Sequence, residues 1–343
     1  MSFKEVIEKN TTISAVNWWP KYAYHFTDVS NAVSILKSGK LYSRINANMI
    51  DVMSNDNASS QVLDFTNAFV KSYVRFYFRP LTPTQYYNEG YKHKQLRFND
   101  DENANTPVPI FFVFDLNKLL SDPKTCFSGS TQAGKGAVVY NSEEDFLKLD
   151  FATIYSKGQM DVADETTKKI RQAEILYPGE YSIKDALVAV VCRNEPERAT
   201  LLNMLNEVDE GGTFNRYKSY VMVSRGDMFY NNAFFIKDVS YNSGSVRILF
   251  NDSYSKDKYA RNENKIEKQL PGLKTLITLS WFTSSKDELY SKSAAVDLSY
   301  NQKGILLNLE TKIPGAKRIE IKVEIEGKII GYYKYNLAES EII

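Results

Sequence analysis

Two kinds of hydrophobic pattern divide the chain. Up to about residue 230, stretches that alternate between apolar and polar positions, such as residues 74–78, are interleaved with segments of helical periodicity. Beyond that point, short apolar runs follow one another between turns rich in Gly, Asn, Asp, Ser or Pro. The first region predicts a mixed α+β domain, and the second predicts an all-β, sandwich-like domain. We place the two domains at residues 1–237 and 238–343.

Particular residues mark the ends of the predicted elements. One helix begins at Asp28 or Ser30, whose side chains can accept from free N–H groups, and ends at Gly39, which tolerates left-handed backbone. Another opens at Asn194, with Pro196 in its first turn. Strands are predicted at 74–78, 107–115, 173–177, 186–192 and 220–224, and then at 246–250, 276–282, 294–298, 304–309, 318–325 and 328–335. Residues 251–268 predict a loop or a surface helix, and Glu326-Gly327 a tight hairpin.

Composition narrows the class of protein. The 343 residues include 43 Lys and Arg against 42 Asp and Glu, so a nucleic-acid site would have to be a local patch. The two cysteines, Cys126 and Cys192, are too few for a disulfide scaffold and are expected to be buried thiols. Neither pairs with a histidine at metal-ligand spacing, so no metal is predicted. Without a secretory signal or a long apolar run, the chain is expected to be cytoplasmic, with no membrane partner.

A glycine-rich segment imitates a phosphate-binding loop. Residues 129–135 have the glycine and lysine spacing of such a loop, but Gly136 stands where Ser or Thr would hold magnesium. We expect no strand before this segment and extended chain after it, where a helix N-terminus should receive the phosphates. It is interpreted as a flexible loop.

Three separated motifs carry the chemistry. They are Tyr24-His25-Phe26-Thr27-Asp28 before the first helix, the aromatic and basic run at residues 73–83, and Arg171-Gln172-Ala173-Glu174-Ile175-Leu176. In this order they resemble the DarT-type ADP-ribosyltransferase toxins, which use NAD to modify bases in single-stranded DNA. The resemblance spans roughly residues 22–230, and it implies an ADP-ribosyltransferase-like mixed fold with NAD as co-substrate.

Glu174 is the strongest catalytic candidate. A carboxylate within an apolar strand is costly to bury, so it needs a partner or an outward-facing position. The resemblance implies that Glu174 grips the ribose and stabilises the oxocarbenium-like state formed when nicotinamide leaves. A lone histidine among aromatic residues is usually a core residue. The resemblance nevertheless implies a cofactor-binding set, which we list as His25, Thr27, Asn31, Arg44 and Tyr77.

The arginine expected by this resemblance is missing from its usual place. Residues 46–71 contain no arginine, and Arg75 stands where the family usually has a proline. Arg44, Arg75 or Arg79 could take over its role, and we assign Arg75 and Arg79 to catalysis together with Glu174. Either arginine could instead bind the pyrophosphate of NAD.

A basic and aromatic stretch continues from Arg75 to Arg97. Cations can neutralise phosphates while rings stack on bases, which suits a single strand. The alternative is a solvated face over an aromatic core. The nucleic-acid candidates are Tyr86, Tyr87, Lys92, Lys94 and Tyr155.

The sequence therefore predicts an NAD-dependent ADP-ribosyltransferase toxin that modifies a base in single-stranded nucleic acid, DNA by family default and mRNA as an alternative. A toxin–antitoxin or phage-defence system is implied, with an antitoxin protein as partner. A transferase acting on protein, with the β domain docking its target, and an inactive binding module are the competing hypotheses. The modified base, the oligomeric state and the role of the β domain stay open, although we expect a fragment ending near Lys237 to remain active.

Overall fold

The computed structural model describes residues 1–14, 16–50, 68–93, 96–97, 105–132, 138–160, 162–209, 211–242, 244–252, 272–309 and 313–337. Several predictions therefore fall outside the described residues. These are Lys94, the end of the glycine-rich segment, most of the interval that lacks arginine, and nearly all of the predicted loop or helix at 251–268.

A seven-stranded sheet organises the N-terminal region, in the order β5-β6-β3-β1-β4-β8-β9. Neighbouring strands are antiparallel except β8 and β9, which are parallel. The strands are β1 (Tyr22–Asp28), β3 (Tyr73–Tyr77), β4 (Pro109–Asp115), β5 (Cys126–Ser128), β6 (Glu174–Pro178), β8 (Leu187–Cys192) and β9 (Val221–Val223). A small separate sheet pairs β2 (Lys40–Tyr42) with β7 (Glu180–Ser182). The short strand β5 is a correction, because we expected no strand before Gly129.

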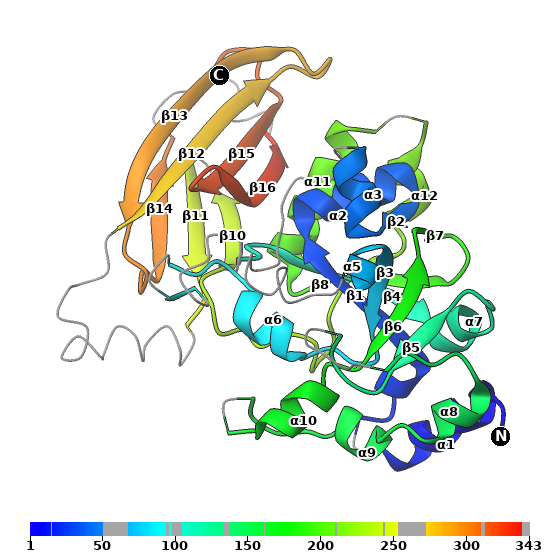
Figure 1. Cartoon of the computed structure of the whole chain (residues 1–343). Helices are drawn as coiled ribbons and strands as arrows, with labels where there is room; N and C mark the ends of the chain where they lie inside the picture. The colour runs from blue at the N-terminus through cyan, green and yellow to red at the C-terminus, as the bar shows by residue number, and fades with distance from the viewer. Residues whose placement is uncertain are drawn as a thin grey trace.

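Helices surround this sheet (Figure 1). In α2 the side chain of Asp28 accepts from the Ser30 N–H, and Gly39 ends the helix at a φ of 70°. In α11 Asn194 accepts from the Glu197 N–H, so both predicted caps are confirmed. The helices are η1 (Trp19–Lys21), α1 (Phe3–Ile13), α2 (Val29–Ser38), α3 (Arg44–Met49), α5 (Ala68–Lys71), α6 (Pro83–Asn88), α7 (Leu116–Leu120), α8 (Glu143–Leu147), α9 (Phe151–Ile154), α10 (Glu165–Ile170), α11 (Glu195–Glu207) and α12 (Thr213–Tyr217).

The C-terminal region is built from antiparallel strands. One sheet has the order β10-β11-β14 and the other β13-β12-β15-β16. Apolar residues of both sheets, such as Ile248 and Ile321, share one hydrophobic core, which is the arrangement of a sandwich. The strands are β10 (Ile236–Asn242), β11 (Ser245–Phe250), β12 (Leu273–Phe282), β13 (Glu288–Leu298), β14 (Gly304–Asn308), β15 (Arg318–Ile325) and β16 (Lys328–Asn336). β13 begins six residues before the strand predicted at 294–298. At the predicted hairpin Glu326 and Gly327 have φ of 51° and 74°.

The two regions are packed against each other. α11 lies on β16, where the Tyr332 N–H donates to Thr200 Oγ1 and Asn203 Nδ2 donates to the Tyr332 carbonyl (Figure 1). Tyr91, which follows α6, is buried in the hydrophobic core of the sandwich. β10 starts at Ile236, so this strand includes the last two residues of the domain predicted at 1–237. The activity of a fragment that ends near Lys237 stays a prediction.

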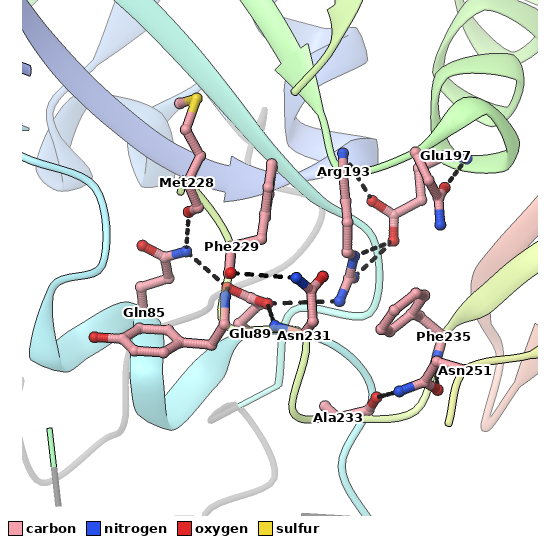
Figure 2. Close-up of polar contacts among 12 residues, drawn as sticks. Gln85, Glu89, Arg193, Glu197, Met228, Phe229, Asn231, Ala233, Phe235 and Asn251 are labelled. Atoms are coloured by element: carbon pink, nitrogen blue, oxygen red, sulfur yellow. Dashed lines mark hydrogen bonds and ion pairs between the residues drawn. The ribbon is translucent and has the colours of Figure 1, made fainter. Parts of the chain in front are cut away.

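A buried ionic network fastens the connection between the regions (Figure 2). The guanidinium of Arg193 donates twice to one oxygen of Glu197, at 2.6 and 3.0 Å, and lies 3.5 Å from Glu89. Glu89 also accepts from the backbone N–H groups of Tyr230 and Asn231, at 2.9 and 2.8 Å. The network therefore links α6, β8 and α11 to the chain segment that leads into the sandwich.

Candidate active site

An ion pair marks the beginning of β6. Glu174 lies opposite Tyr77 in the ladder between β6 and β3, so Arg75, two residues earlier on β3, is its diagonal neighbour on the same face of the sheet. The Arg75 guanidinium donates to both carboxylate oxygens of Glu174, each at 2.6 Å. The Glu174 side chain is fully buried, whereas that of Arg75 is 26% exposed. Arg75 therefore forms the outer side of the pair.

Glu174 keeps some capacity to accept hydrogen bonds. Besides its two bonds from Arg75, it accepts a third from the Gln132 backbone N–H at 3.0 Å. A carboxylate offers about four acceptor positions, so donors from the described residues leave one for a further donor. Burial by itself lowers the pKa of Arg75, but the Glu174 carboxylate more than offsets this and holds that pKa above its usual range. The arginine is therefore charged at every pH of interest.

His25 reaches the same strand from β1. β1 pairs with β4 over seven residue pairs but with β3 at one, Tyr24 with Tyr77. Beyond this pair of residues β1 and β3 are not joined by a backbone ladder, and there His25 Nδ1 lies 3.0 Å from the Arg75 carbonyl oxygen. Because a carbonyl can only accept, Nδ1 carries the proton and Nε2 is left as an acceptor. Burial lowers the pKa of His25, partly opposed by this hydrogen bond, so the ring is neutral near pH 7.

The other cofactor candidates lie around this ion pair and farther along the first motif. Tyr77 is half-buried, its pKa is raised by burial, and it feels the charges of Arg75, Glu174 and Arg44. Arg44 is the first residue of α3. Thr27 is buried near the end of β1, and Asn31 lies in the first turn of α2. The structure therefore places Tyr77 opposite Glu174 and Arg44 within electrostatic reach of Tyr77. Thr27 follows His25 on β1, and Asn31 lies in the helix after it.

Arg79 lies apart from Glu174. Its buried guanidinium donates to the carbonyls of Pro80, Ile154 and Ser156, at 3.0, 2.8 and 2.7 Å. It also lies 4.7 Å from the centroid of the Trp19 ring. Of the two arginines that we expected to be catalytic, only Arg75 contacts the carboxylate.

Two of the expected nucleic-acid residues face inward. Lys92 Nζ donates to the carbonyls of Tyr86 and Tyr87 in the last turn of α6, and burial lowers the pKa of Lys92 to about 8. Tyr155 is 3% exposed and its ring stacks on Phe151. Neither side chain is placed to contact a nucleic-acid strand. The rings of Tyr86 and Tyr87 are half-buried and touch edge to face.

Sequence reasoning missed three polar residues at the site. Gln132 holds Glu174 through its backbone, for which the sequence carries no signal. Gln172 Nε2 donates to Thr84 Oγ1 at 2.7 Å, while the Thr84 N–H donates to Gln172 Oε1 at 3.2 Å. The position of Gln172, two residues before Glu174, could have suggested a supporting role. This contact ties the start of α6 to the start of β6.

Neither a metal centre nor a membrane-spanning helix is found among the described residues. Within the described ranges, His, Cys, Asp and Glu side chains form no group of three that could hold a metal ion. Cys192 is buried, Cys126 is half-buried, and both are free thiols. No helix in the part of the chain that the structure describes is long and apolar enough to cross a bilayer.

Comparison with known proteins identifies the family. The family profile described as "ssDNA thymidine ADP-ribosyltransferase, DarT" matches residues 24–230, more than half of the chain. The chain belongs to the DarT family. It is therefore an ADP-ribosyltransferase, and the resemblance on which the sequence analysis rested is confirmed. The sandwich lies beyond the matched residues.

Solved DarT structures from Thermus sp. 2.9 resemble the chain. The complex with ADP-ribosylated ssDNA has a TM-score of 0.50 and 16% sequence identity, and covers 62% of this chain and 97% of that chain. The complexes with carba-NAD⁺ and NAD⁺ have TM-scores of 0.47 and 0.45, identities of 17% and 15%, and each covers 62% of this chain and 98% of theirs. No curated protein matches the chain. The first likeness confirms the predicted α+β, ADP-ribosyltransferase-like fold.

Proposed function

We propose that this DarT-family enzyme transfers ADP-ribose from NAD to thymine in single-stranded DNA. The observation that carries this proposal is the buried carboxylate of Glu174, which is held by Arg75 and Gln132 and, as far as the described residues go, accepts three hydrogen bonds of the four that it can take. Such a carboxylate can accept a hydrogen bond from a ribose hydroxyl while its negative charge faces the anomeric carbon. NAD is proposed as the donor because a solved DarT structure contains NAD⁺, and thymidine as the acceptor because the family description names it.

Charge development explains why a carboxylate is needed here. When the bond between nicotinamide and ribose breaks, nicotinamide leaves as a neutral molecule and positive charge builds up on the ribose. A preorganised anion stabilises this state more than the ground state, which lowers the barrier. The anomeric carbon then forms a bond to the base. Thymine in DNA carries one N–H, so we assign that nitrogen as the acceptor, and its proton passes to Glu174 and on to water.

Arg75 performs two tasks in this proposal. Its two hydrogen bonds fix the orientation of Glu174, and its positive charge lies against the carboxylate. Since Arg75 is the exposed partner, NAD meets the guanidinium first, and one of its donors must be shared with the cofactor as the ribose reaches Glu174.

The neutral His25 suits the cofactor side of the site. Its Nδ1 is occupied by the Arg75 carbonyl, so Nε2 is left as an acceptor for a ribose hydroxyl or the nicotinamide carboxamide. Arg44 and Tyr77 would add a cation and a half-buried ring beside it. Thr27 and Asn31, beyond His25, complete the proposed NAD site. Tyr86 and Tyr87 are retained as the rings on which the acceptor strand stacks.

Labelled NAD offers a direct test. We would incubate the full chain with ³²P-NAD and, separately, a thymine-containing DNA strand, the same strand with every thymine replaced by cytosine, a matched RNA and cell protein. We expect label on the thymine-containing DNA alone, with one nicotinamide released per ADP-ribose attached. Label on the RNA alone would show the acceptor assignment to be wrong, and label on protein alone would establish the competing hypothesis.

The cellular context stays a prediction. A toxin–antitoxin or phage-defence role, with a protein antitoxin as partner, rests on the family resemblance. We would express the wild type and Glu174→Gln from an inducible promoter in a bacterial host. Growth arrest by the wild type but not by Glu174→Gln would support a role as a toxin.

A further inference from the structure

Gln132 is held beside the proposed catalytic carboxylate by its backbone. β5 pairs with β6 so that Ser128 lies opposite Glu174, and the chain after β5 stays close to the start of β6. The Thr131 N–H donates to the Lys169 carbonyl at 2.9 Å. The next residue, Gln132, donates its backbone N–H to Glu174 Oε1 at 3.0 Å. The position of Gln132 relative to Glu174 is therefore fixed whatever its side chain does.

The side-chain amide of Gln132 is not used in this contact. The residue is 3% exposed, and its Nε2 finds no hydrogen-bond partner among the described residues. A buried amide donor without a partner costs free energy, so such a group in a folded protein calls for an explanation. Gln85 shows the ordinary case, because its Nε2 donates to Glu89 Oε2 and to the Met228 carbonyl, both at 2.7 Å. The amide of Gln132 is thus available to a ligand.

The hydrogen bonds of Glu174 indicate where such a ligand would lie. Oε1 accepts from Arg75 Nη2 and from the Gln132 N–H, whereas among the described residues Oε2 accepts from Arg75 Nε alone. Each carboxylate oxygen can accept two hydrogen bonds, so the position that these donors leave is on Oε2. A group that donates to Oε2 consequently lies beside the carboxylate to which Gln132 is fastened.

The two hydroxyl groups of a ribose fit this arrangement. In the proposed function the Glu174 carboxylate faces the anomeric carbon, so its ligand is the 2′-hydroxyl, on the next carbon of the ring. The 3′-hydroxyl lies directly beside that group, where it can meet a second residue held at the same carboxylate. A hydroxyl both donates and accepts, so it satisfies either end of an amide. We propose that Gln132 is a further NAD-binding residue, whose side-chain amide binds the 3′-hydroxyl of the nicotinamide ribose.

This assignment deepens the proposed function and rests on it, because it presumes that Glu174 binds the 2′-hydroxyl. The Glu174 side chain is as fully buried as the Gln132 nitrogen, and Arg75 is the partly exposed member of the ion pair. The ribose therefore reaches both groups in one step, when Arg75 shares its donors with NAD. Two contacts on adjacent carbons fix the orientation of the ribose, so Gln132 helps to present the anomeric carbon in a productive geometry.

Replacement by methionine separates the side chain of Gln132 from its backbone. Gln132→Met has a similar length and keeps the N–H that holds Glu174, but it lacks the amide. We expect the Kd for NAD, measured by calorimetry, to rise roughly 3- to 10-fold, as for the loss of one hydrogen bond. The melting temperature should not fall, because no described residue loses a partner. Gln85→Met is the matched control, since Glu89 and Met228 would lose their donor and its melting temperature should fall.

An NAD analogue that lacks the 3′-hydroxyl on its nicotinamide ribose identifies the contact. Wild type and Gln132→Met should bind this analogue with the same Kd, since neither protein has the contact to lose. A difference between them as large as with NAD would refute the assignment.

Two further outcomes would overturn the role of Gln132. They are a fall in melting temperature like that of Gln85→Met, which would make Gln132 a structural residue, and an unchanged Kd for NAD with a raised KM for the DNA strand, which would place the amide at the acceptor. Failure of the proposed function is seen separately. If the wild type binds NAD but modifies no thymine-containing DNA, the acceptor is wrong, while the Kd measurements, which need NAD alone, still decide the role of Gln132.

Discussion

Two clusters of arginine and glutamate in this protein contain the same chemical groups in different surroundings. In the pair of Arg75 and Glu174, the arginine side chain is 26% exposed, and the described residues fill three of about four acceptor positions of the carboxylate. In the network of Arg193, Glu89 and Glu197 all three side chains are buried, with at most 3% exposed. The first cluster is open on one side, and the second is enclosed.

The difference explains why we propose a catalytic role for the open pair and a structural role for the enclosed network. Breaking an enclosed pair leaves an uncompensated buried charge, so such a network serves mainly to fix two segments relative to each other. Arg193, for example, also lies 3.8 Å from the centroid of the Phe235 ring, in the segment that enters the sandwich (Figure 2). An open pair can exchange one of its hydrogen bonds for a substrate at little cost. In this proposal, the exposure of an ion pair to solvent and substrate decides between a catalytic and a structural role, because both clusters contain the same residue types.

Glu174→Gln is expected to have the largest effect on activity. The amide keeps the shape of the side chain and one acceptor oxygen, but it removes the charge that stabilises the oxocarbenium-like state. We expect transfer to fall roughly a thousandfold, and stability to change by about 1 kcal/mol because Arg75 remains in contact with solvent. Nicotinamide release and thermal unfolding measure the two effects. Glu180→Gln, which disturbs the exposed pair with Lys40, is the control, and equal activity of the two variants would remove Glu174 from the mechanism.

Arg193→Met should show the opposite behaviour. Two buried carboxylates would lose their shared cation, and we expect unfolding to become easier by about 3–5 kcal/mol. Lys157→Met breaks an exposed pair, so it should cost less than about 1 kcal/mol. Denaturant titration of both variants measures the difference. If Arg193→Met proves too unstable to purify, Arg193→Lys should give an intermediate loss, and full stability of Arg193→Lys would contradict a fastening role.

Local signals in the sequence were sufficient for much of the fold. Alternation predicted β3, caps at Asp28 and Asn194 predicted α2 and α11, and the turn at Glu326 and Gly327 predicted the last hairpin. These features depend on residues close together in the chain. β5 was missed because a strand of three residues carries almost no periodicity.

The site was predicted less completely, for a physical reason. Glu174 and His25 lie in motifs, but the partner of Glu174 is set by the register of β3 against β6. Register cannot be read from either strand alone. The same limit applies to the stretch at residues 85–97. Its charges suggested a nucleic-acid surface, yet Tyr91 is in the core of the sandwich and Arg97 pairs with Glu326 at 2.7 Å.

Lys92→Met sharpens the comparison, because the hydrogen bonds of Lys92 to described residues end on carbonyl oxygens and not on a carboxylate. Lys92 holds the carbonyls of Tyr86 and Tyr87 at the end of α6, so its loss should cost about 1–2 kcal/mol of stability. Because its charge is not offered to the strand, the slope of log affinity against log salt should stay unchanged. If the variant instead has a slope whose magnitude is smaller by about one, measured with a DNA oligonucleotide, then Lys92 contacts a phosphate and belongs to the nucleic-acid surface.

The smallest predicted effect concerns pH and Glu197. Burial, only partly offset by Arg193, raises the pKa of Glu197 to about 7 from an ordinary value of 4.5. The folded protein therefore binds a proton more tightly than the unfolded chain, and the resulting stability is lost as pH rises through about 7. Asp28 acts in the same direction, since burial raises its pKa to about 6.

Comparison with Glu197→Gln isolates Glu197, because Asp28 is present in both proteins. We expect wild type to gain about 1 kcal/mol relative to the variant between pH 8 and pH 6, seen as a rise in denaturation midpoint. A parallel pH dependence in the two proteins would mean that Arg193 keeps Glu197 fully ionised, and the enclosed network would then resemble the open pair more closely than its burial implies.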